Sequence, residues 1–518
     1  MSQNHSKIQR IVILDYGSQY TQLIARRIRE QQVFSEIIRF DTPAAKLAEN
    51  MPQGIILSGG PNSVFEEGAP GIDPEIFKLG VPVLGICYGM QLMSQQLGGK
   101  VHPGESREYG KTKIKTSPDN ELFTGLPDEF TVWMSHGDRV AQIPAGFKVS
   151  ATSTNCPFAA VRNEEKRFYA IQFHPEVVHT EHGNQIIGNF LFKICGCRAD
   201  WKLSSWIDET VARLKAQVGD EEVVLGLSGG VDSSVVAVLL NRAIGKRLHC
   251  IFVDNGLLRH NEAVQVEKMF RTKLDLDLHI ARAAERFYAA LKGVEDPEQK
   301  RKIIGREFIN VFAEQARKFK NAKFLGQGTI YPDVIESSNA LKGPSQTIKS
   351  HHNVGGLPPD LKFELVEPLR DLFKDEVRAV GRVLGMDDEL LDRQPFPGPG
   401  LGVRVLGEVT EEKVKLLQQA DLRVQEEIRK LPGYKNIWQT FAVLLPVKSV
   451  GVMGDQRTYE YTCAIRSVDS IDAMTADWTR IPYETLAAIS NRIINEVRGI
   501  NRVVYDISSK PPATIEWE

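Results

Sequence analysis

The sequence has few cysteines, no excess charge of either sign and no long apolar run. Six cysteines in 518 residues do not make the disulfide framework of a small secreted protein. The 64 basic residues nearly balance the 66 acidic ones, so no domain-wide positive field is present to hold nucleic acid. The apolar runs are far shorter than the ~18 residues that a membrane helix needs. We therefore expect no nucleic-acid partner and no membrane partner.

The rest of the composition is typical of a globular protein. Hydrophobic residues make up 42% of the chain and charged residues 25%, a balance that argues against disorder. The opening residues MSQNHSKIQR contain no apolar segment, so we expect no secretory signal and a cytoplasmic location. At about 150 residues per domain, the length predicts about three or four domains.

The pattern of apolar residues divides the chain. In the first part, short β-branched runs such as 11–14, 54–57 and 81–86 alternate with helical stretches, which favours a mostly parallel sheet covered by helices. The same alternation restarts after a junction near 195–205. The segment QPFPGPGLG, at 394–402, ends it, because helices and central strands avoid its three prolines and three glycines.

Grouped helices and strands follow that segment and indicate a small α+β domain. We therefore predict an α/β protein with two doubly wound, mostly parallel-sheet domains, followed by a smaller α+β domain. The predicted bounds are 8–198, 205–393 and 394–518.

A nucleophile motif lies at 85–89, where Gly-Ile-Cys-Tyr-Gly follows an apolar strand and opens a helical pattern. The flanking glycines permit the sharp turn that lifts a nucleophile out of a sheet. Cys87 is then placed at a helix N-terminus, where the helix dipole favours thiolate. A buried structural cysteine is the simpler alternative for Cys87 considered alone.

A base and an orienting group for Cys87 are found at 168–176, where an expected strand, FYAIQFH, is followed by Pro-Glu. Residues two apart in an extended chain point to the same side, so Glu176 can reach the ring of His174. We predict that Cys87 is the nucleophile, that His174 is the base and then the acid, and that Glu176 fixes its tautomer. The backbone N–H of Tyr88 and the turn at Gly59 are the predicted oxyanion donors.

The strings GICYGMQ, SGGP and FHPEV resemble the class I glutamine amidotransferase family. That resemblance implies a glutaminase domain in which a thiolate attacks the glutamine carboxamide and releases ammonia. The pair Cys195 and Cys197 lacks a second ligand pair at zinc spacing, so a metal site there is not favoured.

A phosphate-binding loop is predicted after the strand at 223–227. Glycines beside a helix N-terminus expose backbone N–H groups that hold phosphate oxygens, and the loop has no lysine of a Walker motif. The string SGGVDSS resembles the ATP pyrophosphatase family, which implies that ATP is split between its α- and β-phosphates. The predicted ATP-binding residues are Ser228, Gly229, Gly230, Val231, Asp232, Ser233 and Ser234.

Neighbouring segments are predicted to complete this second site. Asp232 and Asp333 are candidate carboxylates for Mg²⁺, which neutralises departing pyrophosphate. The strand end at 253–259 is expected to shape an adenosine pocket. The cation-bearing segment 348–358 and Lys374 are further candidates for phosphate contact, with an exposed turn and a solvated lysine as the alternatives.

The order of these motifs, together with PGPGLGVRVLG and the ending KPPATIEWE, resembles the GMP synthetase family over the whole chain. That resemblance implies amidation of xanthosine 5′-monophosphate (XMP) to GMP through an adenyl-XMP intermediate, with ATP, glutamine and Mg²⁺. It also implies a homodimer formed by the C-terminal domain. By the same resemblance Arg306 and Lys510 meet the XMP phosphate and Glu516 meets the purine, contacts that suit their charges.

Three other functions share part of these motifs. An NAD synthetase has the same loop, but usually carries a different glutaminase domain. A tRNA thiolase needs a basic RNA-binding face, which the net charge of −2 does not favour. A hydrolase with a merely regulatory ATP domain predicts glutamine hydrolysis that is independent of any nucleotide acceptor.

Overall fold

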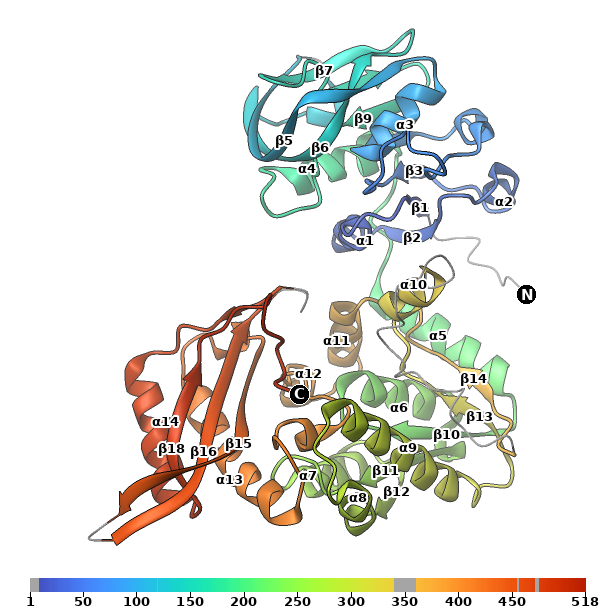
Figure 1. Cartoon of the computed structure of the whole chain (residues 1–518). Helices are drawn as coiled ribbons and strands as arrows, with labels where there is room; N and C mark the ends of the chain where they lie inside the picture. The colour runs from blue at the N-terminus through green and yellow to red at the C-terminus, as the bar shows by residue number, and fades with distance from the viewer. Residues whose placement is uncertain (1–8, 119, 340–359, 454–455, 471–474) are drawn as a thin grey trace. The chain divides into compact units, whose positions relative to one another are not determined.

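The computed structural model describes residues 9–118, 120–339, 360–453, 456–470 and 475–518 (Figure 1). The chain forms two compact units, Met1–Ser205 and Trp206–Glu518, which are described separately below. We call them the amino-terminal unit and the carboxy-terminal unit. Helix α5 (Leu203–Val218) begins at the end of the first unit and continues into the second.

In the described part of the amino-terminal unit, nine strands form one sheet in the order β2-β1-β3-β4-β9-β8-β7-β5-β6. The first five strands in this order are parallel, and the pairs from β9 onward are antiparallel. Strands β3 and β4 are buried along their whole length, as expected for central strands with a layer on each face. The strands are β1 (Arg10–Asp15), β2 (Phe34–Arg39), β3 (Gly54–Leu57), β4 (Val83–Ile86), β5 (Lys100–Thr116), β6 (Glu129–Gln142), β7 (Lys148–Ser153), β8 (Ala160–Asn163) and β9 (Phe168–Ile171).

The helices of this unit connect and cover the parallel strands (Figure 1). Helix α1 buries Ile24, Ala25 and Ile28, which lie on one face of the helix at the spacing of an amphipathic segment. The helical segments are α1 (Thr21–Glu30), α2 (Ala44–Glu49), α3 (Tyr88–Gln96), α4 (Gly183–Gly188), the 3₁₀ segments Pro74–Lys78 and Glu121–Phe123, and the π segment Asn189–Ile194.

In the carboxy-terminal unit, the described strands of the first sheet are all parallel, in the order β12-β11-β10-β13-β14. Its strands are β10 (Glu222–Leu227), β11 (Leu248–Asp254), β12 (Asp277–Arg282), β13 (Ala322–Gly326) and β14 (Glu364–Val366). Its helical segments are α6 (Val231–Ile244), α7 (Glu262–Lys268), α8 (Ala284–Leu291), α9 (Pro297–Ala316), α10 (Tyr331–Asn339), α11 (Lys374–Val383), α12 (Asp388–Leu391), the 3₁₀ segment Gly245–Arg247 and the π segment Met269–Lys273.

A second sheet of the same unit consists of the long hairpin β15–β16, with β17 antiparallel to β16 and β18 parallel to it. Helices α13 and α14 pack on this sheet (Figure 1). These elements are α13 (Glu411–Ile428), β15 (Gln439–Met453), β16 (Gln456–Asp469), β17 (Asp477–Trp478), α14 (Tyr483–Glu496), β18 (Ile500–Asp506) and the 3₁₀ segments Gly400–Val403 and Tyr434–Asn436.

One hydrophobic core joins the two sheets of the carboxy-terminal unit. It contains Val224 and Ile251 from the parallel sheet together with Leu417 and Ile465 from the second sheet and its helix. The predicted fold class is therefore confirmed: parallel α/β sheets are followed by a region of antiparallel strands and helices. The three predicted domain bounds stay a prediction.

Candidate active sites

The turn at Cys87 has the strained backbone of a nucleophile elbow. Cys87 lies between β4 and α3 with φ +51° and ψ −106°, in the left-handed half of the map that residues with a side chain rarely adopt. A Cβ on Gly85 would lie 2.7 Å from the carbonyl oxygen of Gly89, and a Cβ on Gly89 would lie 2.3 Å from that of Leu57. Only glycine fits at either position, which explains why both flank the cysteine.

His174 and Glu176 form a buried pair beside this elbow. The Nδ1 of His174 lies 2.7 Å from Glu176 Oε1, so the ring nitrogen donates to the carboxylate. Both side chains are almost fully buried, and Cys87 is within hydrogen-bonding reach of the ring. Strand β9 ends at Ile171, three residues before the expected end at His174. The backbone remains tied down there because His174 N donates to Trp133 O.

The environment of His174 favours its charged form. Burial lowers the pKa of His174, but the Glu176 carboxylate and the Cys87 sulfur raise it, and the result stands well above its usual range. A protonated imidazole beside a sulfur atom stabilises the thiolate. The geometry therefore supports a protonated imidazole beside the Cys87 sulfur in a buried site.

Each predicted oxyanion donor adjoins one member of this pair: Gly59 adjoins His174, and Tyr88 follows Cys87 in the chain. Gly59 is against the His174 ring, since a Cβ at Gly59 would be 3.0 Å from ring atom Cε1. Tyr88 is the first residue of α3, where backbone N–H groups point out of the helix end. The backbone N–H groups at these two positions stay the predicted oxyanion donors.

Two neighbours of Cys87 were not predicted from the sequence. The Nε2 of Gln172 lies 3.7 Å from Cys87 Sγ, and Sγ lies 3.5 Å from the carbonyl oxygen of Ser135 on β6. Gln172 stands two residues before His174, so the same i, i+2 argument that links His174 to Glu176 could have found it. Ser135 belongs to an antiparallel strand that carries no chemical motif, and no sequence signal identifies it.

The phosphate-binding loop connects β10 to α6 in the carboxy-terminal unit. Gly229 has φ +75°, and α6 begins at Val231 without a side-chain cap among the described residues. The hydroxyls of Ser228 and Ser233 lie 3.0 Å apart, and Ser234 Oγ donates to Gly230 O at 2.7 Å. These side-chain hydrogen bonds stabilise the turn, and the first backbone N–H groups of α6 remain available to bind an anion.

Asp232 lies in the first turn of α6 and forms an ion pair with Lys374, the first residue of α11. Its Oδ1 atom is buried and accepts no hydrogen bond from the described residues. A Cβ on Gly328 would be 3.4 Å from Asp232 Cβ, so the segment before α10 packs against the loop. Asp333 follows on α10, where its Oδ2 accepts from the backbone N–H of Ile330 at 3.1 Å.

These contacts fit a divalent cation at Asp232. A buried carboxylate oxygen that accepts no hydrogen bond can coordinate Mg²⁺, which prefers oxygen ligands. Asp333 already uses one carboxylate oxygen to hold its own turn. The predicted phosphate-contacting segment 348–358 lies outside the described residues.

The three residues expected to meet XMP lie on two segments. Arg306 is exposed on α9, whereas Lys510 and Glu516 belong to the C-terminal tail. The carboxylate of Glu516 accepts two hydrogen bonds from Arg404, at 3.0 and 2.9 Å, and one from Gln439 at 2.9 Å. The backbone of Lys510 exchanges two hydrogen bonds with the backbone of Ala476. The structure therefore orients Glu516 through a buried arginine.

The end of the chain is tied to α9. The carboxylate of Glu518 forms an ion pair with Lys300 and accepts from Gly407 N at 3.3 Å. Lys300 is fully buried and also donates to Val405 O at 2.9 Å. Burial lowers the pKa of Lys300 although Glu518 beside it raises it. Glu518 therefore neutralises a charge that has no access to water.

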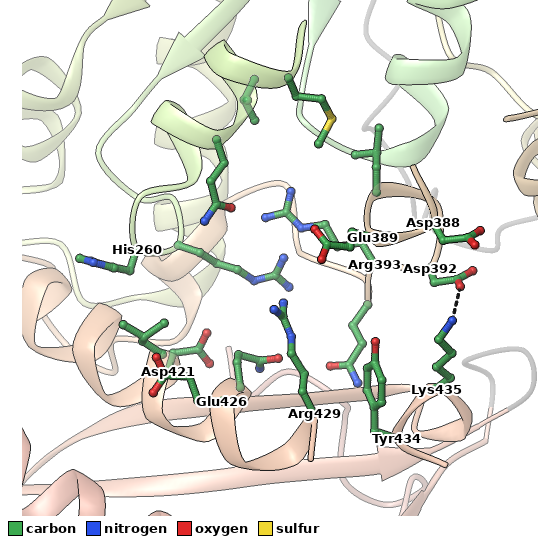
Figure 2. A pocket seen from close by; sticks show the side chains of 18 of the residues that line it. His260, Asp388, Glu389, Asp392, Arg393, Asp421, Glu426, Arg429, Tyr434 and Lys435 are labelled. Carbon is green, nitrogen blue, oxygen red and sulfur yellow. Dashed lines mark hydrogen bonds and ion pairs between the residues drawn. The ribbon is translucent and has the colours of Figure 1, made fainter. Parts of the chain in front are cut away.

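A pocket of about 540 Å³ is lined by residues of α7, α12 and α13 and of the segments that follow them (Figure 2). Arg393 and Arg429 both line it, and Arg393 also donates to Gly229 O at 3.3 Å. Arg259, at the end of the predicted segment 253–259, is another lining residue, and burial lowers its pKa to about 10. The pocket thus adjoins the loop through Arg393.

Three family models match parts of the chain. Residues 12–194 match "Glutamine amidotransferase class-I", residues 202–311 match "NAD synthase" and residues 426–517 match "GMP synthase C terminal domain". Curated relatives with the name "GMP synthase [glutamine-hydrolyzing]" align almost end to end. The protein from Maridesulfovibrio salexigens is 60% identical, covering 98% of this chain and 99% of its own length.

The protein from Brachyspira hyodysenteriae is 58% identical over 99% of this chain and 100% of its own length. The protein from Geobacillus kaustophilus is 59% identical over 98% of this chain and 99% of its own length. The chain belongs to the glutamine-hydrolysing GMP synthase family.

Membership of the GMP synthase family confirms the family resemblance seen in the motifs. It also confirms the prediction of an ATP-dependent ligase that forms GMP with nitrogen from glutamine. The NAD synthase match covers only 202–311, so an NAD synthetase is less supported. None of the helices in the described ranges has the length and apolar character needed to cross a bilayer.

Proposed function

We propose that the two units divide the synthesis of GMP between a glutaminase site and an adenylating site. The amino-terminal unit hydrolyses glutamine to glutamate and ammonia. The carboxy-terminal unit transfers AMP from ATP to the C2 oxygen of XMP and releases pyrophosphate. Ammonia then attacks that carbon, AMP leaves, and GMP is formed. The observation that carries the proposal is the buried Cys87–His174–Glu176 group on the same chain as the loop Ser228–Ser234.

In the first reaction the Cys87 thiolate attacks the carboxamide carbon of glutamine. The N–H groups of Gly59 and Tyr88 stabilise the oxyanion, and the His174 imidazolium gives its proton to the departing ammonia. Water then hydrolyses the thioester with the neutral imidazole as base. Glu176 keeps the Nδ1 proton in place during both steps, which is the role of the third member of a triad.

In the second reaction the N–H groups at the start of α6 bind the phosphates of ATP, and Ser228 and Ser233 supply hydroxyl donors. Mg²⁺, when bound near Asp232, neutralises the negative charge that grows on pyrophosphate. Lys374 forms an ion pair with Asp232, so its ammonium group lies close enough to the loop to contact the phosphates of bound ATP. Asp333 is proposed to support the same metal, although it is already engaged with its own turn.

The proposed acceptor of the nitrogen is XMP, because the chain belongs to the GMP synthase family. Arg306 and Lys510 are proposed to meet its phosphate, because guanidinium and ammonium groups bind phosphate oxygens well. Glu516 is proposed to accept from purine N–H groups, with Arg404 fixing the plane of its carboxylate. Holding both reactions on one chain raises the effective concentration of unprotonated ammonia.

A homodimer is proposed to form through the C-terminal region. In the hairpin β15–β16, Val450 and Tyr459 are opposite each other in the register and are 60% and 66% exposed. Exposed apolar residues on a hairpin are typical of a surface that another subunit covers. Val450→Glu should shift the sedimentation equilibrium toward monomer, whereas Val383→Glu, at a similarly exposed position, should leave it unchanged. A monomeric parent chain would contradict the dimer. The proposed location of the enzyme is the cytoplasm.

The test separates the two nitrogen sources. The Cys87→Ala variant should form no GMP from glutamine, ATP and XMP, yet keep its rate when ammonium salt replaces glutamine. Loss of both activities in a folded variant would contradict the division between the units. Asp232→Ala should stop release of pyrophosphate from ATP and XMP but leave glutamine hydrolysis by Cys87 detectable.

A further inference from the structure

Two histidines and two carboxylates lie together at the amino ends of strands in the parallel sheet of the carboxy-terminal unit. Glu222 is the first residue of β10, His249 the second residue of β11, and Asp277 and His279 are the first and third residues of β12. The phosphate-binding loop follows the carboxyl end of β10. This cluster therefore occupies the opposite edge of the sheet and takes no part in the proposed reaction.

The register of the sheet brings the side chains together. His249 is the direct cross-strand partner of Asp277, and His279 stands two residues farther on the same side of β12. The Oδ2 atom of Asp277 lies 2.7 Å from His249 Nδ1 and 2.9 Å from His279 Nε2. The three ligand-type atoms all lie within 4.8 Å of one another. Small side-chain rotations bring such atoms to the positions around one ion.

The Nε2 nitrogen of His249 lies beside a second carboxylate, that of Glu222. This nitrogen is buried, lies 3.3 Å from Glu222 Oε2 and makes no well-aligned hydrogen bond to any described residue. A carboxylate behind a metal-binding imidazole fixes the proton on the far nitrogen and leaves the near nitrogen free to ligate. Here that arrangement leaves Nδ1 of His249 facing Asp277 and His279.

Packing fixes the two rings. The Phe319 ring stacks on His249 at 4.2 Å with an interplanar angle of 14°, and meets His279 edge-on at 4.8 Å. Preorganised rings lose less freedom when they take up a ligand. The His249 side chain is 14% exposed, and those of Asp277 and His279 are 35% and 38% exposed. An ion can therefore reach the cluster from solvent.

We propose that His249, Asp277 and His279 bind one divalent transition-metal ion, with Zn²⁺ as the occupant, and that Glu222 orients His249. Two imidazoles and a carboxylate suit zinc, whereas Mg²⁺ prefers oxygen ligands alone. Water completes the coordination. Binding needs both ligating nitrogens unprotonated, so each ion that binds releases any proton held there. The ion joins β12, the edge strand, to β11.

The test uses the full chain without a polyhistidine tag, stripped of metal with a chelator. Zn²⁺ is titrated while the midpoint of thermal unfolding is followed, because an ion that binds only the folded state raises it. His279→Asn should remove the shift and weaken binding at least 100-fold. Glu222→Gln should weaken it by about 10- to 100-fold. The surface variant His102→Asn, in the other unit, should behave as the parent.

Cobalt distinguishes this cluster from cysteine sites. Co²⁺ bound by nitrogen and oxygen shows visible d–d bands without the near-ultraviolet charge-transfer band of a thiolate ligand. The parent chain should show those visible bands, and His279→Asn should lose them while its metal-free unfolding midpoint stays close to that of the parent. A thiolate band alone, or equal binding by the parent chain and His279→Asn, would overturn the proposal.

Discussion

The two sites differ in how their charged groups are balanced before any substrate arrives. At the proposed glutaminase site Cys87, His174 and Glu176 already contact one another, and these are the partners that the proposed reaction uses. At the proposed adenylating site Asp232 forms an ion pair with Lys374, and Glu516 forms one with Arg404. The catalytic groups proposed for the first site are thus already assembled in the free protein. The charged groups proposed for the second site are in internal ion pairs, which bound substrates would have to rearrange.

The difference follows from the size of the ligands. Glutamine is small, and the residues proposed to act on its carboxamide come from one strained turn and one short buried segment. ATP and XMP carry several negative charges, and the residues proposed to bind them, such as Ser228 and Glu516, are far apart in the sequence. A site for them needs many cations and carboxylates, and buried charges without partners are costly. The ion pair of the buried Arg404 with Glu516 offsets part of that cost in the free protein.

The largest expected effect comes from Glu518→Ala, which breaks the adenylating unit alone. Lys300 is fully buried and loses its counter-ion, and removing one partner of a buried pair costs about 3–5 kcal/mol. Chemical denaturation followed by tryptophan fluorescence should show the carboxy-terminal unit unfolding earlier. Glutamine hydrolysis should persist. Glu75→Gln, which breaks an exposed pair with Lys78, is the control and should change stability by less than about 1 kcal/mol.

Next in size is Gly89→Ala, which breaks the glutaminase site alone. Its Cβ would overlap the carbonyl oxygen of Leu57, so the elbow must shift and Cys87 moves with it. A displacement of about 1 Å costs on the order of 100-fold in rate. The glutamine-dependent rate should fall by at least that factor while the ammonia-dependent rate is unchanged. Gly71→Ala, where a Cβ meets open space, should leave both rates intact, and equal loss in the two variants would refute the steric argument.

A smaller effect is expected for Glu176→Gln, and it depends on pH. Glu176 raises the pKa of His174 against burial, which lowers it. Without the carboxylate the pKa falls, so the imidazolium loses its proton at a lower pH than in the parent. The alkaline limb of kcat/KM for glutamine should therefore move to lower pH, with the maximum reduced about 10- to 100-fold. An unmoved limb would show that Glu176 has no charge effect on the ring.

The smallest effect is expected for Lys374→Met. If Lys374 contacts the phosphates when ATP binds, the variant loses that contact. Its KM for ATP should then rise about fivefold, which corresponds to about 1 kcal/mol. The Mg²⁺ dependence should also change, because Asp232 loses the cation that neutralises it. Glutaminase kinetics should be those of the parent. A KM for ATP equal to that of the parent would limit Lys374 to pairing with Asp232.

Local signals in the sequence predicted the parts of the fold that depend on local physics. The apolar runs that form β3 and β4 predict buried strands from their composition alone. The glycines around Cys87 predict a sharp turn, because a residue with a side chain does not fit at those positions. The contact of His174 with Glu176 follows from a spacing of two residues. Such features could be read without knowing the tertiary structure.

Long-range pairing could not be read in the same way. The antiparallel hairpin β5–β6 supplies Ser135 to the neighbourhood of Cys87, but its pairing is set by the whole sheet. The partners of Glu516 and Glu518, Arg404 and Lys300, lie more than 100 residues away in the sequence. A lone charge in a sequence does not say which opposite charge will be buried with it.

The anchoring of Glu518 makes this side chain a shared support for two separate segments of the carboxy-terminal unit. Its carboxylate neutralises Lys300 on α9 and also accepts from the backbone N–H of Gly407, which precedes α13. A label or reporter attached at Glu518 would disturb both contacts at once. An attachment point in the amino-terminal unit is therefore the better choice for a labelled form of the enzyme.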